Sequence, residues 1–588
     1  MRNMKKSILL IAIIGVMAVS VNAATNVNSD IAGPVIWTKA NSPYHLKKQI
    51  FVLPGASLTM EAGVVVASFV DDQGSLAVTP GAKIYVMGTK DEPVIMTSAE
   101  DVANWTGSIV VRGGTGGTVS AITTMGDPKT GIWMERCNDW GNLTILGKGI
   151  ISASHFGGAP IPGNTKCPTG VNMRQMEGLV AAFPGDPNVF YGGNDDDDDS
   201  GEIHYLSIRY GGKVIGLTNE LNGLSLGGVG RQTEIDHVEI MNNVDDGIEI
   251  WGGTVNLKYI SVWNIGDDSL DVDQGWRGCA QYGLIVQGHS VDAPQGSGVG
   301  DNAIEMDGAE DSDAQPMTTT RITNFTVVGQ PIHGDHGTAW RDNARAQFDN
   351  CIFMDLGERL VQLDNVDGDG ANGYGYNGTL SWANTWTTSL ASWLSSAQGE
   401  INRCGVDLND IYVAYSCADM NKPLASITNS VFYNNAFATA YTEATSRGVF
   451  NAANCNVIAD INYMPIQELV RGPAVVKGGR TMLPVTFINP CAANDAVTSY
   501  TRVPACNCKD NNNRPAIMPA PFIGAFSPYY NWLEGWTATY AYGMTDTTMN
   551  TVSDSTSMSV PDDGDLNNDM KTDLFDLATL ANSWLVKE

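Results

Sequence analysis

The sequence predicts an all-β chain folded as a right-handed parallel β-helix, a solenoid in which every turn of the coil adds short strands to parallel sheets. A small or acidic turn followed by an apolar-polar-apolar strand occurs four times between residues 221 and 308. The first apolar residue of this motif recurs at Leu224, Ile248, Leu270 and Ile304, in steps of 24, 22 and 34 residues. A second strand pattern falls between these motifs, at 235–240, 255–260, 281–286 and 321–327. Two short strands per repeat of about 22 residues are typical of a solenoid, because each turn buries its apolar residues only by stacking on its neighbours.

Strand patterns of the same kind occur outside these four repeats. Alternating apolar and polar residues between Pro-Gly and Gly-Thr turns predict that the coil begins in the N-terminal region and returns after a long insertion at 370–398. Residues 389–394 of that insertion are expected to form a short helix. An aromatic segment at 522–526, with Trp532 and Trp536, is expected to close the coil. The other expected strands lie at 55–60, 75–81, 83–88, 93–97, 140–147, 203–210, 350–354 and 426–433.

The chain divides into five predicted segments. Residues 1–23 have a basic start, an apolar run and a small-residue exit, which predict a secretory signal peptide and therefore an extracellular or cell-surface protein. The N-terminal strands and the start of the coil occupy 24–150, and the β-helix with its loop insertions and C-terminal cap occupies 151–546. A linker at 547–561 precedes a short C-terminal segment at 562–588. No later stretch has the 18 or more apolar residues of a transmembrane helix.

Composition excludes some partners. The 588 residues include 64 acids and 34 bases, for a net charge of −30. Such a charge repels polyphosphates, so nucleic acid is not expected as a partner. The ten cysteines of an exported chain permit disulfides, and Cys404 with Cys417 is one candidate pair.

Five consecutive aspartates stand at 195–199. Adjacent carboxylates repel one another, so this stretch must be solvated or neutralised by a cation. The sequence leaves both a solvated loop and a metal site open.

The C-terminal segment carries a predicted calcium loop. Oxygen donors occupy positions 1, 3, 5, 9 and 12 of a 12-residue stretch, with a backbone carbonyl available at position 7, and an apolar helix face follows. Such alternation wraps hard oxygen ligands around one calcium ion. The expected ligands are Asp565, Asn567, Asp569, the Lys571 carbonyl, Asp573 and Asp576.

This loop followed by a helix resembles a dockerin repeat, a module by which secreted bacterial enzymes and surface proteins attach to a receptor domain. The resemblance covers about 25 residues and implies a cohesin-like receptor as a partner. Met570 stands where that family usually has glycine, and a single repeat is present where paired dockerins have two.

The acids at the start of the repeating strands are candidates for chemistry. Equivalent residues on adjacent turns of a parallel coil stack about 4.8 Å apart, which would place Asp246 beside Asp267 and Asp268. Carboxylates one or two turns apart approach the separations that glycosidases use, roughly 5 to 9.5 Å. Three interpretations remain open: the acids cap turns, they form a calcium ladder, or they catalyse a reaction.

The core resembles an uncharacterised family of exported bacterial right-handed parallel β-helix proteins that are similar to pectin lyases. The resemblance rests on the motifs at 191–194, 222–230, 245–256 and 266–273 and on the aromatic segment at 523–526. It spans most of the mature chain. It implies the fold and export, because the family has no settled activity.

The coil also has a looser similarity to pectin-degrading hydrolases of the polygalacturonase type. Those enzymes use an Asp in one turn, an Asp pair in the next, then a His-Gly and an Arg-x-Lys. Asp246, Asp267 and Asp268 match the first two elements, whereas His336 comes one turn late and no Arg-x-Lys follows. A lyase would need a basic residue near bound calcium, for which Arg277 and Arg341 are candidates.

Two functions follow from these observations. The first is a secreted or cell-surface β-helix for binding or display, which engages polysaccharide and attaches through its calcium-dependent tail. The second is a polysaccharide-degrading hydrolase or lyase that uses Asp246, Asp267, Asp268 and His336. Trp251, Trp263, Trp276 and Trp340 recur near the same columns, where they either stack on sugars or pack in the protein.

Overall fold

A computed structural model gives the structure of the coil. It describes residues 24–152, 172–215, 220–288, 300–309, 316–364, 380–396, 411–435, 461, 463–477, 479–493, 516–520 and 522–546. The predicted signal peptide and the predicted calcium loop with its ligands lie outside these residues. Among the described residues, no helix is long and apolar enough to cross a membrane.

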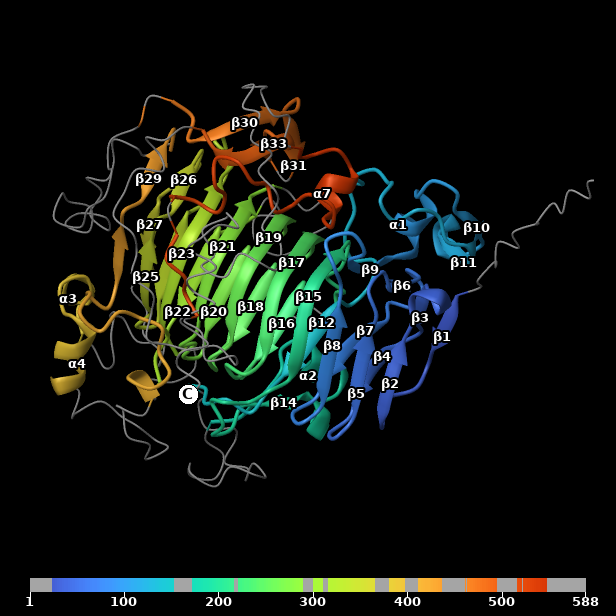
Figure 1. Cartoon of the computed structure of the whole chain (residues 1–588), viewed down its shortest axis with the longest axis horizontal. Helices are drawn as coiled ribbons and strands as arrows, with labels where there is room; N and C mark the ends of the chain where they lie inside the picture. The colour runs from blue at the N-terminus through green and yellow to red at the C-terminus, as the bar shows by residue number, and fades with distance from the viewer. Residues whose placement is uncertain are drawn as a thin grey trace, which may run out of the picture.

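The chain forms a parallel β-helix, as the sequence predicts (Figure 1). In the part of the chain that the structure describes, one sheet, which we call sheet B, contains nine parallel strands from successive turns. Leu224 pairs with Ile248, Ile248 with Leu270, and Leu270 with Ile304, so the predicted series is the actual register. In chain order its strands are β4 (Gln49–Val52), β7 (Ser75–Val78), β12 (Leu143–Leu146), β16 (Leu224–Gly227), β18 (Ile248–Trp251), β20 (Leu270–Asp273), β22 (Ile304–Asp307), β24 (Thr338–Arg341) and β27 (Val361–Leu363).

The second sheet, sheet A, has sixteen strands within the described ranges and changes along the coil. In the first turns two short strands contribute to it per turn, whereas in the middle turns they merge into one long strand, and they separate again near the end. The early strands are β1 (Thr25–Val27), β2 (Pro34–Trp37), β3 (Tyr44–Leu46), β5 (Ser57–Met60), β6 (Val65–Ser68), β8 (Lys83–Met87) and β9 (Val94–Ser98). The long strands are β15 (Gly201–Arg209), β17 (Glu234–Asn243), β19 (Asn256–Ile265), β21 (Cys279–Val286) and β23 (Thr319–Val328), and the late ones are β25 (Arg345–Asp349), β26 (Ile352–Met354), β28 (Ser426–Thr428) and β29 (Val431–Tyr433).

A column of residues with positive φ bends each long strand of sheet A. These residues include Tyr205, His237, Tyr259 and Tyr282, with φ between 51° and 63°. Left-handed backbone is unusual for such bulky residues, and here their rings stack on one another from turn to turn, with centroids 4.1, 4.4 and 4.9 Å apart. Ring stacking along the coil axis therefore stabilises the bend. In the following turns asparagine takes the position, at Asn324, Asn350 and Asn429.

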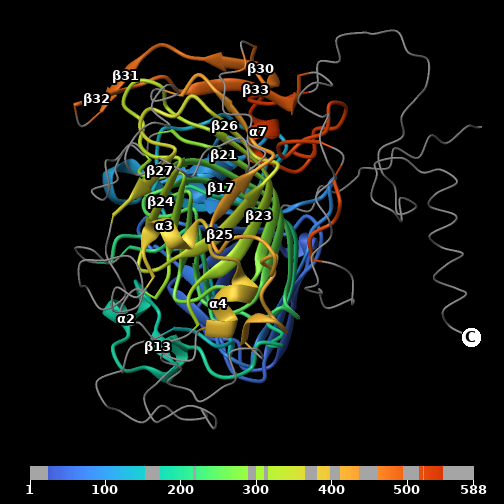
Figure 2. The same ribbon diagram turned by 90° about the vertical axis from the view of Figure 1, so that its left-hand side faces the viewer.

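The apolar core runs along the inside of the coil. Its side chains are the inward residues of both sheets, such as Leu226, Ile250 and Val272 from sheet B. At the far end of the coil, Trp382 and Trp386 of the helical insertion pack against Trp340. Figure 2 shows the insertion helices at that end of the coil. They are α3 (Trp382–Thr385) and α4 (Leu390–Ser396), and α4 confirms the short helix expected at 389–394.

The remaining elements lie on the outside of the coil. They are α1 (Ala99–Ala103) with the hairpin β10 (Ile109–Arg112) and β11 (Val119–Thr124), α2 (Leu179–Ala182) with β13 (Arg174–Gln175) and β14 (Phe190–Tyr191), β30 (Ile466–Arg471) paired with β33 (Val485–Ala492), β31 (Val475–Lys477) paired with β32 (Arg480–Met482), and α7 (Ala538–Ala541). Among the described residues, short 3₁₀ turns lie at Lys39–Asn41, Thr115–Gly117 and Pro187–Val189.

The aromatic segment that we expected to close the coil packs along its side instead. We call residues 522–546 the strap. Trp532 and Trp536 lie edge-on against the ring of His237 in the stacked column of sheet A. Beyond them, the Tyr542 hydroxyl donates to Asp101, close to the first turns. The strap therefore covers the outer face of sheet A and reaches back toward the N-terminal turns.

One buried carboxylate anchors the strap. Glu239 of β17 is completely buried and accepts hydrogen bonds from the backbone N–H groups of Ala538 and Thr539, at 2.6 and 3.1 Å. The Thr539 hydroxyl also donates to it at 3.1 Å. These donors stand at the start of α7, where backbone N–H groups have no partner within the helix.

We expect Glu239→Ala to release the strap. The substitution leaves these buried donors without an acceptor, which costs about 1–3 kcal/mol for each unsatisfied group. The melting temperature should fall, and limited proteolysis should cut within 522–546 before it cuts the coil. The exposed Glu61→Ala is the control. Equal proteolysis of the two variants would show that Glu239 does not hold the strap.

Candidate functional site

The acids at the corner before sheet B form a hydrogen-bonded ladder along the coil. The Asn222 side chain accepts the backbone N–H of Asp246 at 3.2 Å, and Asp246 accepts that of Asp268 at 2.9 Å. Asp268 in turn accepts the backbone N–H of Asn302 at 2.6 Å. Asp246 and Asp268 are buried. Both catalytic candidates therefore have a structural role at the corner, as the turn-capping interpretation predicts.

The acids one residue earlier form a second row that is partly exposed. This row contains Asp245, Asp267 and Asp301, with buried Asp335 at its end. Asp267 and Asp301 share a hydrogen bond between their carboxyl groups. Burial, together with the charges of Asp335 and Asp267, raises the pKa of Asp301 to about 8. Asp301 consequently carries a proton at neutral pH.

The outward side chains of the sheet B strands add further acids. Glu249 pairs in register with Asp271, and Asp271 with Glu305, so these three carboxylates lie on one face of adjacent strands. Asp307, two residues after Glu305, is also buried there. We call the two rows and these outward acids the acidic face. It consists of Asp245, Asp246, Glu249, Asp267, Asp268, Asp271, Asp301, Glu305, Asp307 and Asp335.

Two overlapping groups of three carboxylates on the acidic face come close enough for each group to hold a cation. Ligand atoms of Asp245, Asp246 and Asp267 all lie within 4.8 Å of one another, as do those of Asp246, Glu249 and Asp271. Burial and the mutual repulsion of these charges raise the pKa values of Asp245, Asp246 and Glu249 well above their usual range. The cluster is therefore stable when it holds protons or a cation, and costly when all its members are ionised.

Neither arginine that sequence analysis nominated as a lyase base is available for that role. Arg277 is completely buried and forms a bidentate ion pair with Asp196, at 2.6 and 2.8 Å. Arg341 lies at the edge of the acidic face, where its Nε is 2.8 Å from both carboxylate oxygens of Asp307. It also forms an ion pair with Glu305. These carboxylates raise the pKa of Arg341 further, against the cost of its burial, so it stays cationic.

His336 lies one turn beyond Asp301, at the end of the outer row. Its Nε2 is 3.4 Å from Asp335, and its Nδ1 is 3.6 Å from Glu358 and accepts the backbone N–H of Arg359 at 3.2 Å. The ring is thus engaged on both nitrogens. The four candidate catalytic residues therefore do not form one site. Asp246 and Asp268 cap turns, Asp267 contacts Asp301, and His336 belongs to a neighbouring cluster.

The aspartates at 196–199 do not gather their charges at one point. Asp196 pairs with Arg277, and Asp197 pairs with Arg231 at 2.6 Å. Asp198 is 3.9 Å from Lys148, and Asp199 contacts Lys83. Because each of these four carboxylates has its own cationic side chain, the loop is neither simply solvated nor arranged as a metal site.

The recurring tryptophans pack inside the protein. Trp251, Trp263, Trp276 and Trp340 are at most 3% exposed. Trp276 and Trp340 belong to the main core, whereas Trp263 packs under the strap and Trp251 under the α2 insertion. The interpretation that these rings stack on sugars is therefore wrong, and the interpretation that they pack in the protein is confirmed.

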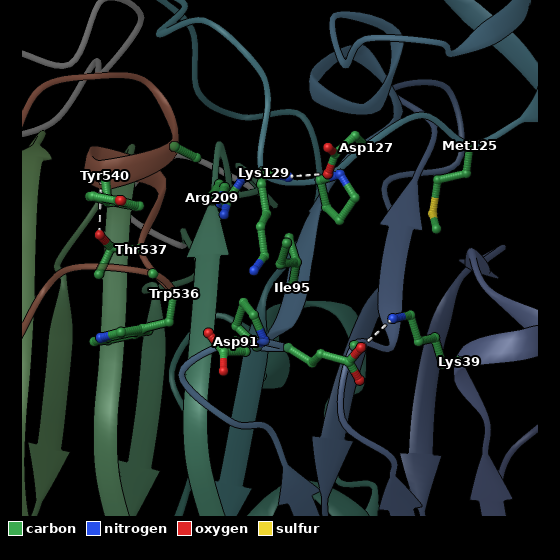
Figure 3. Close-up of a pocket in the computed structure, with 16 residues that line it drawn as sticks. Lys39, Asp91, Ile95, Met125, Asp127, Lys129, Arg209, Trp536, Thr537 and Tyr540 are labelled. Atoms are coloured by element: carbon green, nitrogen blue, oxygen red, sulfur yellow. Dashed lines mark hydrogen bonds and ion pairs between the residues drawn. The ribbon is translucent and has the colours of Figure 1, made fainter. Parts of the chain in front are cut away.

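A small pocket of about 200 Å³ lies where the strap reaches the N-terminal turns (Figure 3). Its wall contains the Lys39–Glu92 ion pair, at 2.7 Å, and residues of the strap including Trp536 and Tyr540. Arg209 also lines the pocket, donates a hydrogen bond to Ser207 and pairs with Asp101. No member of the acidic face lines this pocket.

Four acids of this face are not among the candidates that the sequence motifs suggested: Glu249, Asp271, Glu305 and Asp307. The signal was present, because each is a polar residue of the repeating apolar-polar-apolar strand, and alternate residues of a strand face opposite sides. Reading the outward position of every repeat would have placed these acids beside the corner acids.

The fold and the acidic face define a parallel β-helix with a carboxylate cluster on one outer sheet. A family model described as a pectate-lyase-like β-helix domain matches residues 29–126 and 130–400, more than half of the chain. The chain belongs to this family. No curated protein and no solved structure matches the chain.

We expect the charge on Asp301 to destabilise the coil as the pH rises. Its raised pKa means that the folded state holds a proton that the unfolded state releases near pH 4. The stability that this proton contributes is complete below about pH 4 and is lost as the pH approaches 8. In the presence of EDTA, the melting temperature of Asp301→Asn should therefore exceed that of the wild type, and the difference should grow between pH 4 and 8. The exposed Asp91→Asn is the control, and a constant difference between Asp301→Asn and wild type would contradict the assignment.

Proposed function

We propose that this protein is an extracellular or cell-surface β-helix that binds acidic polysaccharide through divalent cations held on its acidic face. The observation that carries this proposal is the cluster of Asp245, Asp246, Glu249, Asp267 and Asp271, with ligand atoms within 4.8 Å in each overlapping group of three. Asp245, Asp267 and Asp271 are partly exposed, so a bound cation would remain accessible to a ligand.

The donor set suits calcium. Calcium takes six to eight oxygen ligands at about 2.3–2.6 Å, so two oxygens on one ion lie at most about 5 Å apart. Within each overlapping group of three, the carboxylates meet that limit, and neither group includes a nitrogen or sulfur donor. A calcium ion would also remove the repulsion that raises the pKa values of Asp246 and Glu249, so its binding energy would stabilise the fold.

A cation also explains how so acidic a chain could hold an acidic sugar. Uronate carboxylates are repelled by a protein of net charge −30. Calcium can accept ligands from both the protein and the sugar, and the partly exposed acids leave one side of the cluster open. Arg341 at the edge of the face, with its side chain 39% exposed, offers a further cation to a sugar carboxylate.

Binding is favoured over cleavage by the state of the candidate catalytic groups. Asp246 and Asp268 accept backbone hydrogen bonds in the corner ladder. Arg341 is held as a cation by Asp307 and Glu305. A lyase base must be able to take a proton from the sugar, and neither Arg277 nor Arg341 is placed to do so.

We further propose that the C-terminal segment attaches the protein to a cohesin-like receptor. This rests on the oxygen donors of the loop at Asp565–Asp576 and on their resemblance to a dockerin repeat. The protein would then have two kinds of calcium site, one for the polysaccharide and one for the receptor.

We expect mutations to affect the two calcium sites independently. The full chain should bind polygalacturonate in the presence of calcium. It should release the polysaccharide when EDTA removes the calcium. Combined Glu249→Gln and Asp271→Asn should weaken that binding by at least roughly tenfold, or about 1.4 kcal/mol, because two of the five carboxylates lose their charge. Asp565→Ala should remove calcium from the tail in a calorimetric titration and leave polysaccharide binding intact. Polysaccharide binding that persists in EDTA would refute the proposal.

Hydrolysis is the second candidate function, and the protonated state of Asp301 favours it. A general acid must hold a proton at working pH beside an ionised partner. The pKa of Asp301 is raised to about 8, so this residue meets the first part of the condition and lies beside the other acids of its row.

We expect the wild type to release no new reducing ends from acidic or neutral polysaccharides, and no unsaturated uronate products that absorb ultraviolet light. If reducing ends do form, Asp301→Asn must abolish them while Asp565→Ala does not. Activity that passes this test would replace binding by hydrolysis as the function of the acidic face.

A further inference from the structure

A group of metal-ligating side chains lies on sheet A, away from the acidic face. Glu202 and His204 are alternate residues of β15, and Glu234 and Asp236 are alternate residues of β17. The two strands are parallel, with Glu202 in register with Glu234 and His204 in register with Asp236. These four side chains therefore occupy the corners of a square on two neighbouring strands, which lie about 4.8 Å apart.

All four side chains point away from the core. Ile203 and Ile235, which alternate with them, are at most 2% exposed and belong to the core of the coil. Side chains of His204 and Asp236 are 23% and 24% exposed, and that of Glu202 is 41% exposed. The square is consequently open to solvent, and an ion could enter it directly.

The His204 ring is oriented as metal-binding histidines commonly are. Its Nδ1 lies 2.9 Å from Oδ2 of Asp236, and the other oxygen of Asp236 is 2.6 Å from Nδ1 of His237. A ligating histidine usually donates its second ring N–H to a carboxylate, which fixes its tautomer and direction. With Nδ1 turned toward Asp236, Nε2 faces Glu202, whose Oε2 is 3.9 Å away.

The distances within the group suit a single ion. His204, Glu234 and Asp236 each offer a ligand atom within 4.8 Å of the other two. A zinc ion bound at about 2.0–2.2 Å from nitrogen and oxygen ligands needs donors within about 4 Å of one another, so small side-chain rotations would complete the site. Lys258 of β19 lies in register with Asp236 of β17. A bound metal would therefore have this cationic side chain as a neighbour.

We propose that Glu202, His204 and Glu234 bind a divalent transition metal at the surface, of which zinc is the representative, and that Asp236 orients the His204 ring. One imidazole with two carboxylates suits zinc or manganese better than calcium, because calcium prefers a full shell of oxygens. The site is independent of the acidic face, since it lies on the other sheet and uses no residue of that cluster.

Zinc titration of the untagged full chain tests this site. The protein is first treated with EDTA and then kept in excess calcium, so that oxygen-rich sites are occupied. We expect one zinc per chain by calorimetry. His204→Ala and Glu234→Gln should each remove that site, and Asp236→Asn should weaken it by about 10- to 100-fold, as loss of an orienting carboxylate does.

The control is His333→Ala, which removes an exposed histidine outside the square. Cobalt(II) in place of zinc should give visible absorption bands that disappear in His204→Ala and persist in His333→Ala. Circular dichroism establishes that each variant is folded before titration. Absence of zinc binding to the wild type, or undiminished binding to folded His204→Ala, would overturn the proposal and leave His204 and Asp236 as a structural ion pair.

Discussion

The in-register stacking of successive turns is the constraint on which this structure depends. A turn of the coil cannot bury its own apolar residues, so each one is stable only when equivalent residues of the next turn cover it. The register Leu224–Ile248–Leu270–Ile304 satisfies this inside the coil. The same register also aligns the outward side chains of successive turns, whatever their chemical type. It therefore places rings above rings, asparagines above asparagines, and carboxylates above carboxylates.

The outcomes of this repetition differ between the two sheets. On sheet A, like residues attract: the rings of Tyr205, His237, Tyr259 and Tyr282 stack along the bend and are covered by the strap. On sheet B, like residues repel, because Glu249 and Asp271 are brought side by side. The chain relieves part of that repulsion with Arg341, with the proton on Asp301 and with backbone donors in the corner ladder. The remaining charge is what a divalent cation would neutralise.

Charge neutralisation by the chain itself distinguishes structural acids from candidate ligands. The aspartates at 196–199 contact four different cationic side chains, and Glu239 is enclosed by backbone and hydroxyl donors of the strap. These acids hold segments together. The cluster around Asp246 and Glu249 instead contains acids whose nearest charged neighbours are other acids. This contrast within one molecule is the reason for assigning the ligand site to sheet B.

The sequence by itself determined the fold and the turn-to-turn register, because a repeat of about 22 residues buries its apolar positions by stacking on the equivalent positions of the next turn. It also determined that acids would recur at the corners, including Asp246 and Asp268. It did not reveal which acids point outward together, nor that the aromatic segment at 522–546 returns along the side of the coil. Those outcomes depend on contacts between residues far apart in the chain, such as Glu239 with Thr539 and Arg277 with Asp196. Local patterns determine strands and turns, whereas the partner of a buried charge is decided only when the turns have stacked.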